Sequence, residues 1–233
     1  MANLKGSERS HYVQGMFARI APRYDLMNRI MTMGQDARWR SEVIRRAALN
    51  PGETLLDLGA GTGDLAGEAL RRHPSCFVVA ADFTLEMMQS GKQRPGAVRI
   101  NWSAADAQKL PFPDQAFDAV VSGFLLRNVS DLPGSLSEQY RVLRPGGRVV
   151  SLDTTRPEPN LLSPFINFHL HTMIPWLGRI IAGDSDAYTY LPDSTAGFLS
   201  AEQLASRMAA AGFRDVGFAR RMFGTVAVHW GIK

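Results

Sequence analysis

A run of glycines and acidic residues carries the most specific chemical signal in this chain. Residues 54–58 predict a buried strand, and the glycines that follow stand at alternate positions: Gly59, Gly61 and Gly63. Glycines directly after a strand allow the backbone to approach a nucleotide closely before the next helix begins. The G-x-G-x-x-G fingerprint of dinucleotide sites requires a glycine where this chain has Asp64. The spacing therefore favours an adenosyl ligand other than a dinucleotide.

Asp57 narrows the identity of that ligand. It lies near the end of the predicted strand, just before the glycines, where it would repel a pyrophosphate. A cationic ligand would be attracted instead, because opposite charges interact strongly in a partly desolvated cleft. S-adenosylmethionine carries a sulfonium and an ammonium group, so the residue favours this methyl donor. Alternatively, Asp57 only braces the loop.

A second carboxylate follows the next predicted strand. Residues 77–81 form its apolar run, and Asp82 closes it. Nucleotide-binding βαβ units place an acidic residue about 20 positions after the glycines, where it holds the ribose hydroxyls through charge-assisted hydrogen bonds. Asp82 could also cap the helix that starts near Thr84, and the two roles are compatible.

Composition places few further limits on function. The chain has 233 residues, of which 45% are apolar, and no repeat or linker divides it, so we expect one domain, 1–233. The absence of a leader-like segment or a long apolar stretch predicts a cytoplasmic protein. The single cysteine, Cys76, excludes a disulfide framework within one chain. The net charge of +4 arises from dispersed basic residues, so we expect no nucleic-acid partner.

Hydrophobic periodicity predicts the elements that position these residues. Apolar residues at helical spacing indicate an N-terminal helical cap, 1–50. After it, short apolar runs alternate with helical windows, which is typical of a parallel sheet with helices on both faces. We expect strands at 54–58, 77–81, 98–103, 117–122 and 147–152, helices at 63–73, 84–92 and 133–143, and a closing antiparallel strand pair at 213–218 and 225–230. The apolar insertion 157–200 predicts a lid, a surface for apolar partners, or an extra helix pair over the core.

Several stretches resemble the ubiquinone/menaquinone biosynthesis C-methyltransferases, a class I family that uses S-adenosylmethionine. They are residues 16–28 with Trp39-Arg40, the glycine loop through Asp64, residues 106–107 and 110–113, Leu126-Arg127-Asn128-Val129, the Pro-Gly-Gly turn of 143–147, and residues 186–191 and 226–231. The resemblance implies a Rossmann-like α/β fold, with a seven-stranded, mostly parallel sheet and an antiparallel C-terminal strand. Leu125 and Asp153 depart from a glycine and a glutamate that are common in the family, and these departures bear on which quinol is the substrate.

The resemblance also assigns cofactor contacts to four positions: Thr62, Asp82, Asp106 and Ala107. Thr62, near a helix start, can donate to the methionine carboxylate. Asp106 can accept from the adenine amino group, and the backbone amide of Ala107 can meet the ring edge. Asp106 could instead be only a turn residue after the strand.

The implied reaction methylates a ring carbon of a reduced quinone. That carbon becomes nucleophilic when the neighbouring phenolic hydroxyl ionises, and a tyrosine-like pKa of about 10 then requires roughly 4 kcal/mol of anion stabilisation near neutral pH. Arg127 is the main candidate for stabilising the phenolate, Asn128 can orient the hydroxyl, and Tyr24 can bond the same oxygen or close over the cofactor. An ion-pair role for Arg127 and a packing role for Tyr24 are the alternatives. His169 and His171 are minor candidates for proton acceptance, and no metal site is expected.

The leading hypothesis is a C-methyltransferase acting on a prenylated quinol, either demethylmenaquinol or the equivalent ubiquinone-pathway benzoquinol. The cap and the insertion would then shelter the isoprenoid chain. One alternative is a methyltransferase of another phenolic or lipid molecule with the same cofactor. The other is a nonenzymatic S-adenosylmethionine-binding scaffold of a quinone-synthesis assembly. A peripheral contact with the inner face of the membrane and a homodimer are compatible with the sequence.

Overall fold

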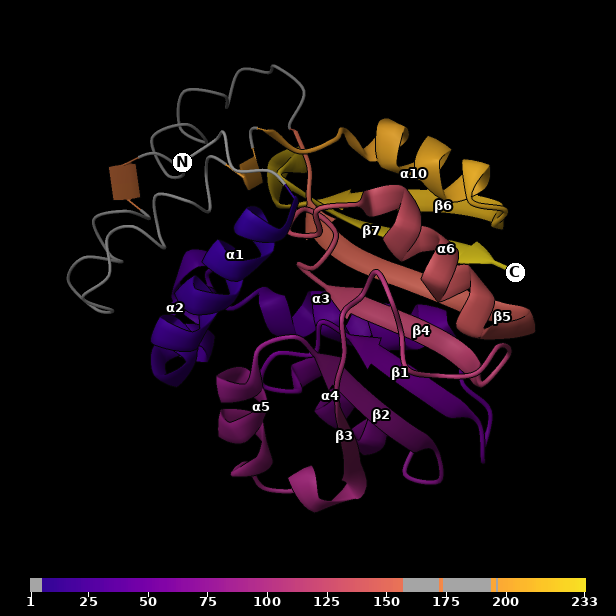
Figure 1. Cartoon of the computed structure of the whole chain (residues 1–233), viewed down its shortest axis with the longest axis horizontal. Helices are drawn as coiled ribbons and strands as arrows, with labels where there is room; N and C mark the ends of the chain where they lie inside the picture. Colours follow the sequence, from indigo (N-terminus) through magenta and orange to yellow (C-terminus); the bar gives the residue numbers. More distant parts are fainter. Residues whose placement is uncertain (1–5, 157–171, 174–193, 196) are drawn as a thin grey trace.

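A computed structural model describes residues 6–156, 172–173, 194–195 and 197–233 (Figure 1). Its strands are β1 (Thr54–Leu58), β2 (Phe77–Asp82), β3 (Ile100–Ala104), β4 (Phe117–Gly123), β5 (Leu143–Thr154), β6 (Arg214–Arg221) and β7 (Val226–Ile232). Its α-helices of eight residues or more are α1 (Gly6–Ile20), α2 (Tyr24–Met31), α3 (Asp36–Ala47), α4 (Asp64–Arg72), α5 (Leu85–Lys92), α6 (Leu132–Val142) and α10 (Ala201–Ala210). The predicted helices and strands of these segments are therefore present, with shifts of a few residues at their ends.

The strands of the described residues form one seven-stranded sheet in the order β3-β2-β1-β4-β5-β7-β6. Strands β1 to β5 pair in parallel, and β7 runs antiparallel to both β5 and β6. This arrangement confirms the predicted fold class, including the antiparallel C-terminal strand. The last two strands do pair with each other, and β7 enters the sheet between β5 and β6, so that β6 forms the edge.

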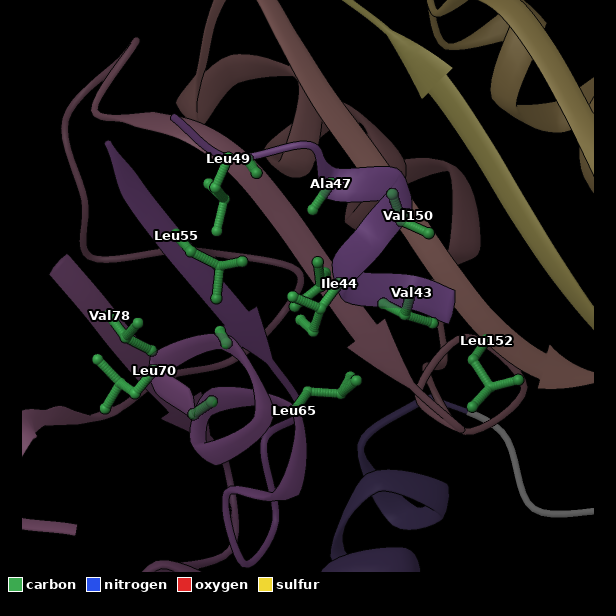
Figure 2. Packing of buried hydrophobic residues seen from close by; sticks show 14 of the residues in the cluster. Val43, Ile44, Ala47, Leu49, Leu55, Leu65, Leu70, Val78, Val150 and Leu152 are labelled. Atoms are coloured by element: carbon green, nitrogen blue, oxygen red, sulfur yellow. The ribbon is translucent and has the colours of Figure 1, made fainter. Parts of the chain in front are cut away.

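Adjacent residues of β1 explain why helices cover both faces of the sheet. Leu55 and Leu56 are both fully buried, and successive side chains of a strand point to opposite faces. On the face of Leu55, α3 and α4 pack against the strands, and Figure 2 shows Ile44 of α3 directed into this cluster. On the face of Leu56, α6 and α10 contribute Leu136 and Leu204.

Local capping defines the starts of the two helices on this second face. The Asp131 side chain accepts a hydrogen bond from the Gly134 amide at the start of α6, at 3.1 Å. At the start of α10, Ser200 and Gln203 form a reciprocal capping box, with bonds of 3.2 and 2.9 Å. Both caps satisfy amide groups that a helix start leaves without an intrahelical partner.

Helices α1 and α2 lie together at one end of the sheet, whereas α3 packs on its face (Figure 1). The 3₁₀ turn η1 (Ala21–Arg23) contains Pro22 and joins α1 to α2. Most of the predicted insertion 157–200 lies outside the described residues, and so do His169 and His171. Within the described residues, no helix is both long and apolar enough to cross a membrane.

Candidate active site

The loop after β1 requires glycine for both backbone and steric reasons. Gly59, Gly61 and Gly63 have φ values of +67°, +56° and +81°, in the left-handed region that side chains disfavour. A Cβ on Gly59 would lie 2.8 Å from Cδ1 of Leu125, and one on Gly63 would lie 2.7 Å from Cη2 of Trp102. The loop is therefore tightly packed at the carboxyl end of β1, where α/β sheets bind ligands.

Asp57 is almost completely buried beneath this loop, with 1% of its surface exposed. Its Oδ2 accepts a hydrogen bond from the Ala66 amide at 2.9 Å, in the first turn of α4, whereas its Oδ1 has no partner. Burial, assisted by the negative charges of Asp82 and Asp64, raises the pKa of the Asp57 carboxyl to about 7. The residue thus braces the loop, and its second oxygen is a buried acceptor without a hydrogen-bond partner.

Asp82 connects the glycine loop with the start of α5. Its Oδ2 accepts from the Gly61 amide and its Oδ1 from the Thr84 amide, each at 2.7 Å. Burial raises the pKa of the Asp82 carboxyl, and these amide bonds oppose the increase. Thr84 is itself the residue that precedes α5, and no side chain caps the helix there, so Asp82 orders the approach to α5 and does not cap it. Each carboxylate oxygen has a second lone pair, so two vicinal hydroxyls can bond to the same group.

A cavity of about 120 Å³ extends from the loop across the carboxyl ends of the strands. Its lining includes seven of the predicted site residues: Tyr24, Gly59, Gly61, Asp82, Asp106, Ala107 and Asn128. Helix α1 supplies Val13, Gln14 and Phe17 to the same cavity, and Gln14 Nε2 donates to the Phe83 carbonyl at 3.1 Å. The N-terminal helices therefore cover the site.

The predicted adenine end of the cavity is built on a turn. Asp106 is exposed, and its Oδ1 accepts from the backbone amide and the side-chain amide of Gln108, at 2.9 and 3.2 Å. The alternative of a turn residue is thus realised, although Asp106 also lines the cavity. Ala107 beside it is buried.

A smaller cavity of about 40 Å³ shares Tyr24, Gly59 and Gly61 with the larger one and is also lined by Asp57 and Thr62. Because Tyr24 and the glycine loop border both cavities, the unpaired Asp57 oxygen belongs to the same site as the larger cavity.

Thr62 has a partner that the sequence did not predict. Its hydroxyl donates to Asp25 Oδ1 at 2.8 Å, so the donor expected for a methionine carboxylate is already engaged. Arg94 reaches the same region, where it bonds Asp25 Oδ2 at 2.5 Å and Asp64 Oδ1 at 2.7 Å. Asp25 belongs to the N-terminal stretch singled out above, but no spacing rule links it to residues 37 and 69 positions later.

Two of the three candidate catalytic residues line the cavity, and the third lies behind them. Tyr24 and Asn128 line the large cavity, whereas Arg127 is not among its lining residues. The Arg127 guanidinium is buried and bonds Asp153 Oδ1 at 2.7 Å, and the Arg127 amide donates to Asp153 Oδ2 at 3.2 Å. The ion-pair alternative is therefore realised.

The charge of Arg127 nevertheless acts on the site. Burial raises the pKa of the Tyr24 phenol, and the positive charges of Arg127 and Arg40 oppose that increase. Asn128 donates from Nδ2 to the Phe124 carbonyl at 2.9 Å, which fixes the orientation of its amide.

Sequence reasoning missed Phe124. This bulky residue has a φ of +59°, lines both cavities, and places its ring centroid 5.1 Å from the Arg127 guanidinium carbon. A bulky side chain in the left-handed region is uncommon and strains the backbone. The sequence contains no signal for it, because the strain arises from the backbone path between β4 and the following turn.

The donor set fits an adenosyl ligand that carries a positive charge. An unpaired buried carboxylate oxygen lies beneath the glycine loop, which lines both cavities, and a second carboxylate stands at the end of the next strand. This arrangement suits an ammonium or sulfonium group, a ribose and an adenine ring arranged in sequence along the cavity.

Comparisons with known proteins agree with this geometry. Residues 5–233 match the model of the ubiE/COQ5 methyltransferase family. A ubiquinone/menaquinone biosynthesis C-methyltransferase UbiE from Desulfotalea psychrophila is 49% identical over 95% of this chain and 90% of its own length. A demethylmenaquinone methyltransferase from Thermus thermophilus is 42% identical over 93% of this chain and 99% of its own. Among solved structures, a SAM-dependent methyltransferase from Thermotoga maritima, titled a possible histamine N-methyltransferase, shares the fold with a TM-score of 0.66 at 18% identity, over 94% of this chain and 98% of that one. The chain belongs to the ubiE/COQ5 methyltransferase family and is an S-adenosylmethionine-dependent C-methyltransferase.

Proposed function

We propose that the acceptor of this enzyme is a prenylated quinol, so that the enzyme adds the ring methyl group during respiratory quinone biosynthesis. The names of its relatives in both quinone pathways support this substrate class. The observation that carries the proposal is the cavity of about 120 Å³, whose lining includes the glycine loop and Asp82 together with Tyr24 and Asn128. Such a cavity brings a charged methyl donor and a hydroxylated ring together.

The cofactor roles follow from the placement of the acidic residues. Oδ1 of Asp57 would attract the positive charge of the bound donor, and Asp82 would accept from the ribose hydroxyls. Asp106 and Ala107 would meet the adenine ring. When bound, S-adenosylmethionine supplies an electrophilic methyl group. The protein aligns that group with the ring carbon, which removes much of the entropic cost of the reaction.

The acceptor oxygen would lie against Tyr24 and Asn128. Both side chains line the cavity and can hydrogen-bond a phenolic oxygen. Arg127 lies behind them, and its positive charge favours ionisation of a phenol at this position, just as it opposes the increase that burial causes in the Tyr24 pKa. Asp153 fixes the guanidinium and also offsets part of its charge. Arg127 would therefore stabilise the phenolate through the local electrostatic field.

Apolar residues in the cavity suit the ring and the start of an isoprenoid chain. The lining includes Val13, Phe17, Phe124, Leu125 and Val129. Outside the cavity, Leu26 and Met33 are 53% and 61% exposed near α2, which supports a peripheral contact with the membrane from which the substrate comes.

A substrate panel with labelled cofactor tests the proposal. Purified enzyme, methyl-labelled S-adenosylmethionine and one reduced acceptor are combined, and the product is examined for a new carbon–methyl bond. The acceptors are a prenylated demethylnaphthoquinol, a prenylated benzoquinol that lacks the ring methyl, and the same rings without a prenyl chain. We expect the label on a ring carbon of at least one prenylated acceptor. Transfer to other phenols but to neither prenylated quinol would reject the proposed acceptor.

A further inference from the structure

One carboxylate of the N-terminal helices contacts the cofactor loop and a second core element at the same time. Asp25 of α2 accepts from the Thr62 hydroxyl through Oδ1, at 2.8 Å, and from Arg94 through Oδ2, at 2.5 Å. Thr62 belongs to the glycine loop, and Arg94 follows the end of α5. Asp25 thus joins the cap to two segments of the Rossmann-like core.

Further charges hold these partners in place. Arg94 also bonds Asp64 at 2.7 Å and the Thr62 carbonyl at 3.0 Å, and Arg40 bonds both Asp64 and Asp36, at 2.8 and 2.7 Å. The carboxylates and guanidinium groups alternate from α3 through the start of α4 to α2. Asp64 and the Thr62 carbonyl hold the Arg94 side chain independently of Asp25. The Asp25–Arg94 ion pair therefore costs less side-chain entropy than an isolated surface pair does.

Tyr24 is the chain neighbour of Asp25 and lines both cavities of the site. It is the first residue of α2, and the residues before it form a short 3₁₀ turn. The position of its phenol over the cofactor loop therefore depends on how α2 is docked. Among the contacts described above, Asp25 supplies the polar bonds that fasten α2 to the loop itself.

We propose that Asp25 is a positioning residue of this methyltransferase: through Thr62 and Arg94 it fastens α2 onto the glycine loop and so holds Tyr24 at the site. The catalytic part of this inference rests on the proposed function, whereas the docking part does not. The carboxylate must remain ionised to hold Arg94. Burial and the nearby Asp64 raise the pKa of the Asp25 carboxyl, so the Asp25–Arg94 ion pair weakens as the pH falls and the carboxyl becomes protonated.

The docking part is tested by amide hydrogen exchange of the full chain with and without S-adenosylmethionine. Asp25→Asn keeps an acceptor for Thr62 but removes the charge that Arg94 pairs with. We expect amides of α2 to exchange about tenfold faster than in the wild type, a factor typical of one charge-assisted contact, while those of β1 and β4 keep their rates. Arg71→Met removes a different ion pair, with Glu68 on α4, and should leave α2 unchanged.

The positioning part is tested by a double-mutant cycle with Tyr24→Phe. If Asp25 acts through Tyr24, Asp25→Asn should lower kcat about tenfold in the wild-type background and less than twofold in Tyr24→Phe, because coupled residues are not additive. Asp25→Glu should restore part of the loss.

Unchanged exchange of α2 in Asp25→Asn would overturn the docking role. Fully multiplicative losses in the cycle, or equal losses in Arg71→Met, would overturn the positioning role. If the wild type methylates no prenylated quinol, the proposed acceptor fails, yet the cycle can still be measured with whichever phenol accepts the methyl group. The exchange experiment is unaffected by that outcome.

Discussion

Replacing Asp57 with Asn should stabilise the cofactor-free protein while weakening cofactor binding. The folded protein holds this carboxyl at a pKa of about 7, compared with 3.8 for an unperturbed aspartate. The folded state therefore prefers the protonated form. Its penalty for a charged Asp57 is absent below about pH 4, grows as the pH rises, and is complete above the folded pKa. The difference between the two pKa values makes this penalty about 4 kcal/mol of unfolding free energy at pH 8 and about 2 kcal/mol at pH 5.

Asp57→Asn removes this penalty and keeps an acceptor for the Ala66 amide. Its new NH₂ group would occupy the position of the unpaired Oδ1, and a buried donor without a partner costs about 1 kcal/mol. The free energy of unfolding should therefore increase by about 3 kcal/mol at pH 8 and by about 1 kcal/mol at pH 5. The other charges that act on this carboxyl are those of Asp82, Asp64 and Arg40, which the substitution leaves in place.

Urea denaturation at the two pH values measures the stability, and calorimetric titration at pH 8 measures S-adenosylmethionine affinity. Losing a charged acceptor should weaken binding by about 1.5–3 kcal/mol, or roughly 10- to 100-fold. Asp118 lies on β4, beside the start of β1 and its Thr54 amide; Asp118→Asn keeps an acceptor for that amide but removes the charge that pairs with Arg144, and it should give no gain at pH 8. A stability change that is equal at both pH values, or an unchanged affinity, would refute the reasoning.

Other substitutions test the remaining parts of the site. Asp82→Ala should weaken S-adenosylmethionine binding at least tenfold, because two charge-assisted bonds are lost, and an unchanged calorimetric affinity would remove its ribose role. Gly59→Ala should lower the free energy of unfolding by about 1–3 kcal/mol more than Gly52→Ala in urea denaturation. Both positions have positive φ, but only at Gly59 would the new Cβ collide with a neighbour, so equal losses would show that the contact relaxes. Arg127→Gln removes the positive charge behind Tyr24 and Asn128, so it should slow methyl transfer about tenfold or more at unchanged cofactor affinity, and full activity would remove Arg127 from the mechanism.

The sequence predicted the central sheet well because β1, β2 and β4 lie within it. Their side chains are buried on both faces and therefore read as short apolar runs between helical windows. The start of β5 was harder to predict. In the structure, β5 begins at Leu143, before the turn that the sequence predicts. That turn shifts the pairing of β5 with β4 between Phe117 and Ala119. Residues of β5 pair with β4 both before and after this irregularity, which contains glycines. The segment is therefore one strand, although its sequence predicts a turn followed by a strand.

The position of two acidic residues at the candidate site could be predicted because parallel strands end at the same edge of a sheet. Asp57 and Asp82 follow from that rule and from the chemistry of the ligand. The burial of Arg127 against Asp153 could not be predicted, since it depends on how two strand ends pack. The bond from Thr62 to Asp25 could not be predicted either, because it depends on how α2 packs against the glycine loop.

A crystal structure of the protein with bound S-adenosylhomocysteine would test the central claim most directly. The account predicts ribose hydroxyls on the Asp82 carboxylate, the adenine beside Asp106 and Ala107, and the amino group of the ligand nearest to Oδ1 of Asp57. Density for the ligand at another surface, or in this cavity with its adenine against Asp57, would contradict the account.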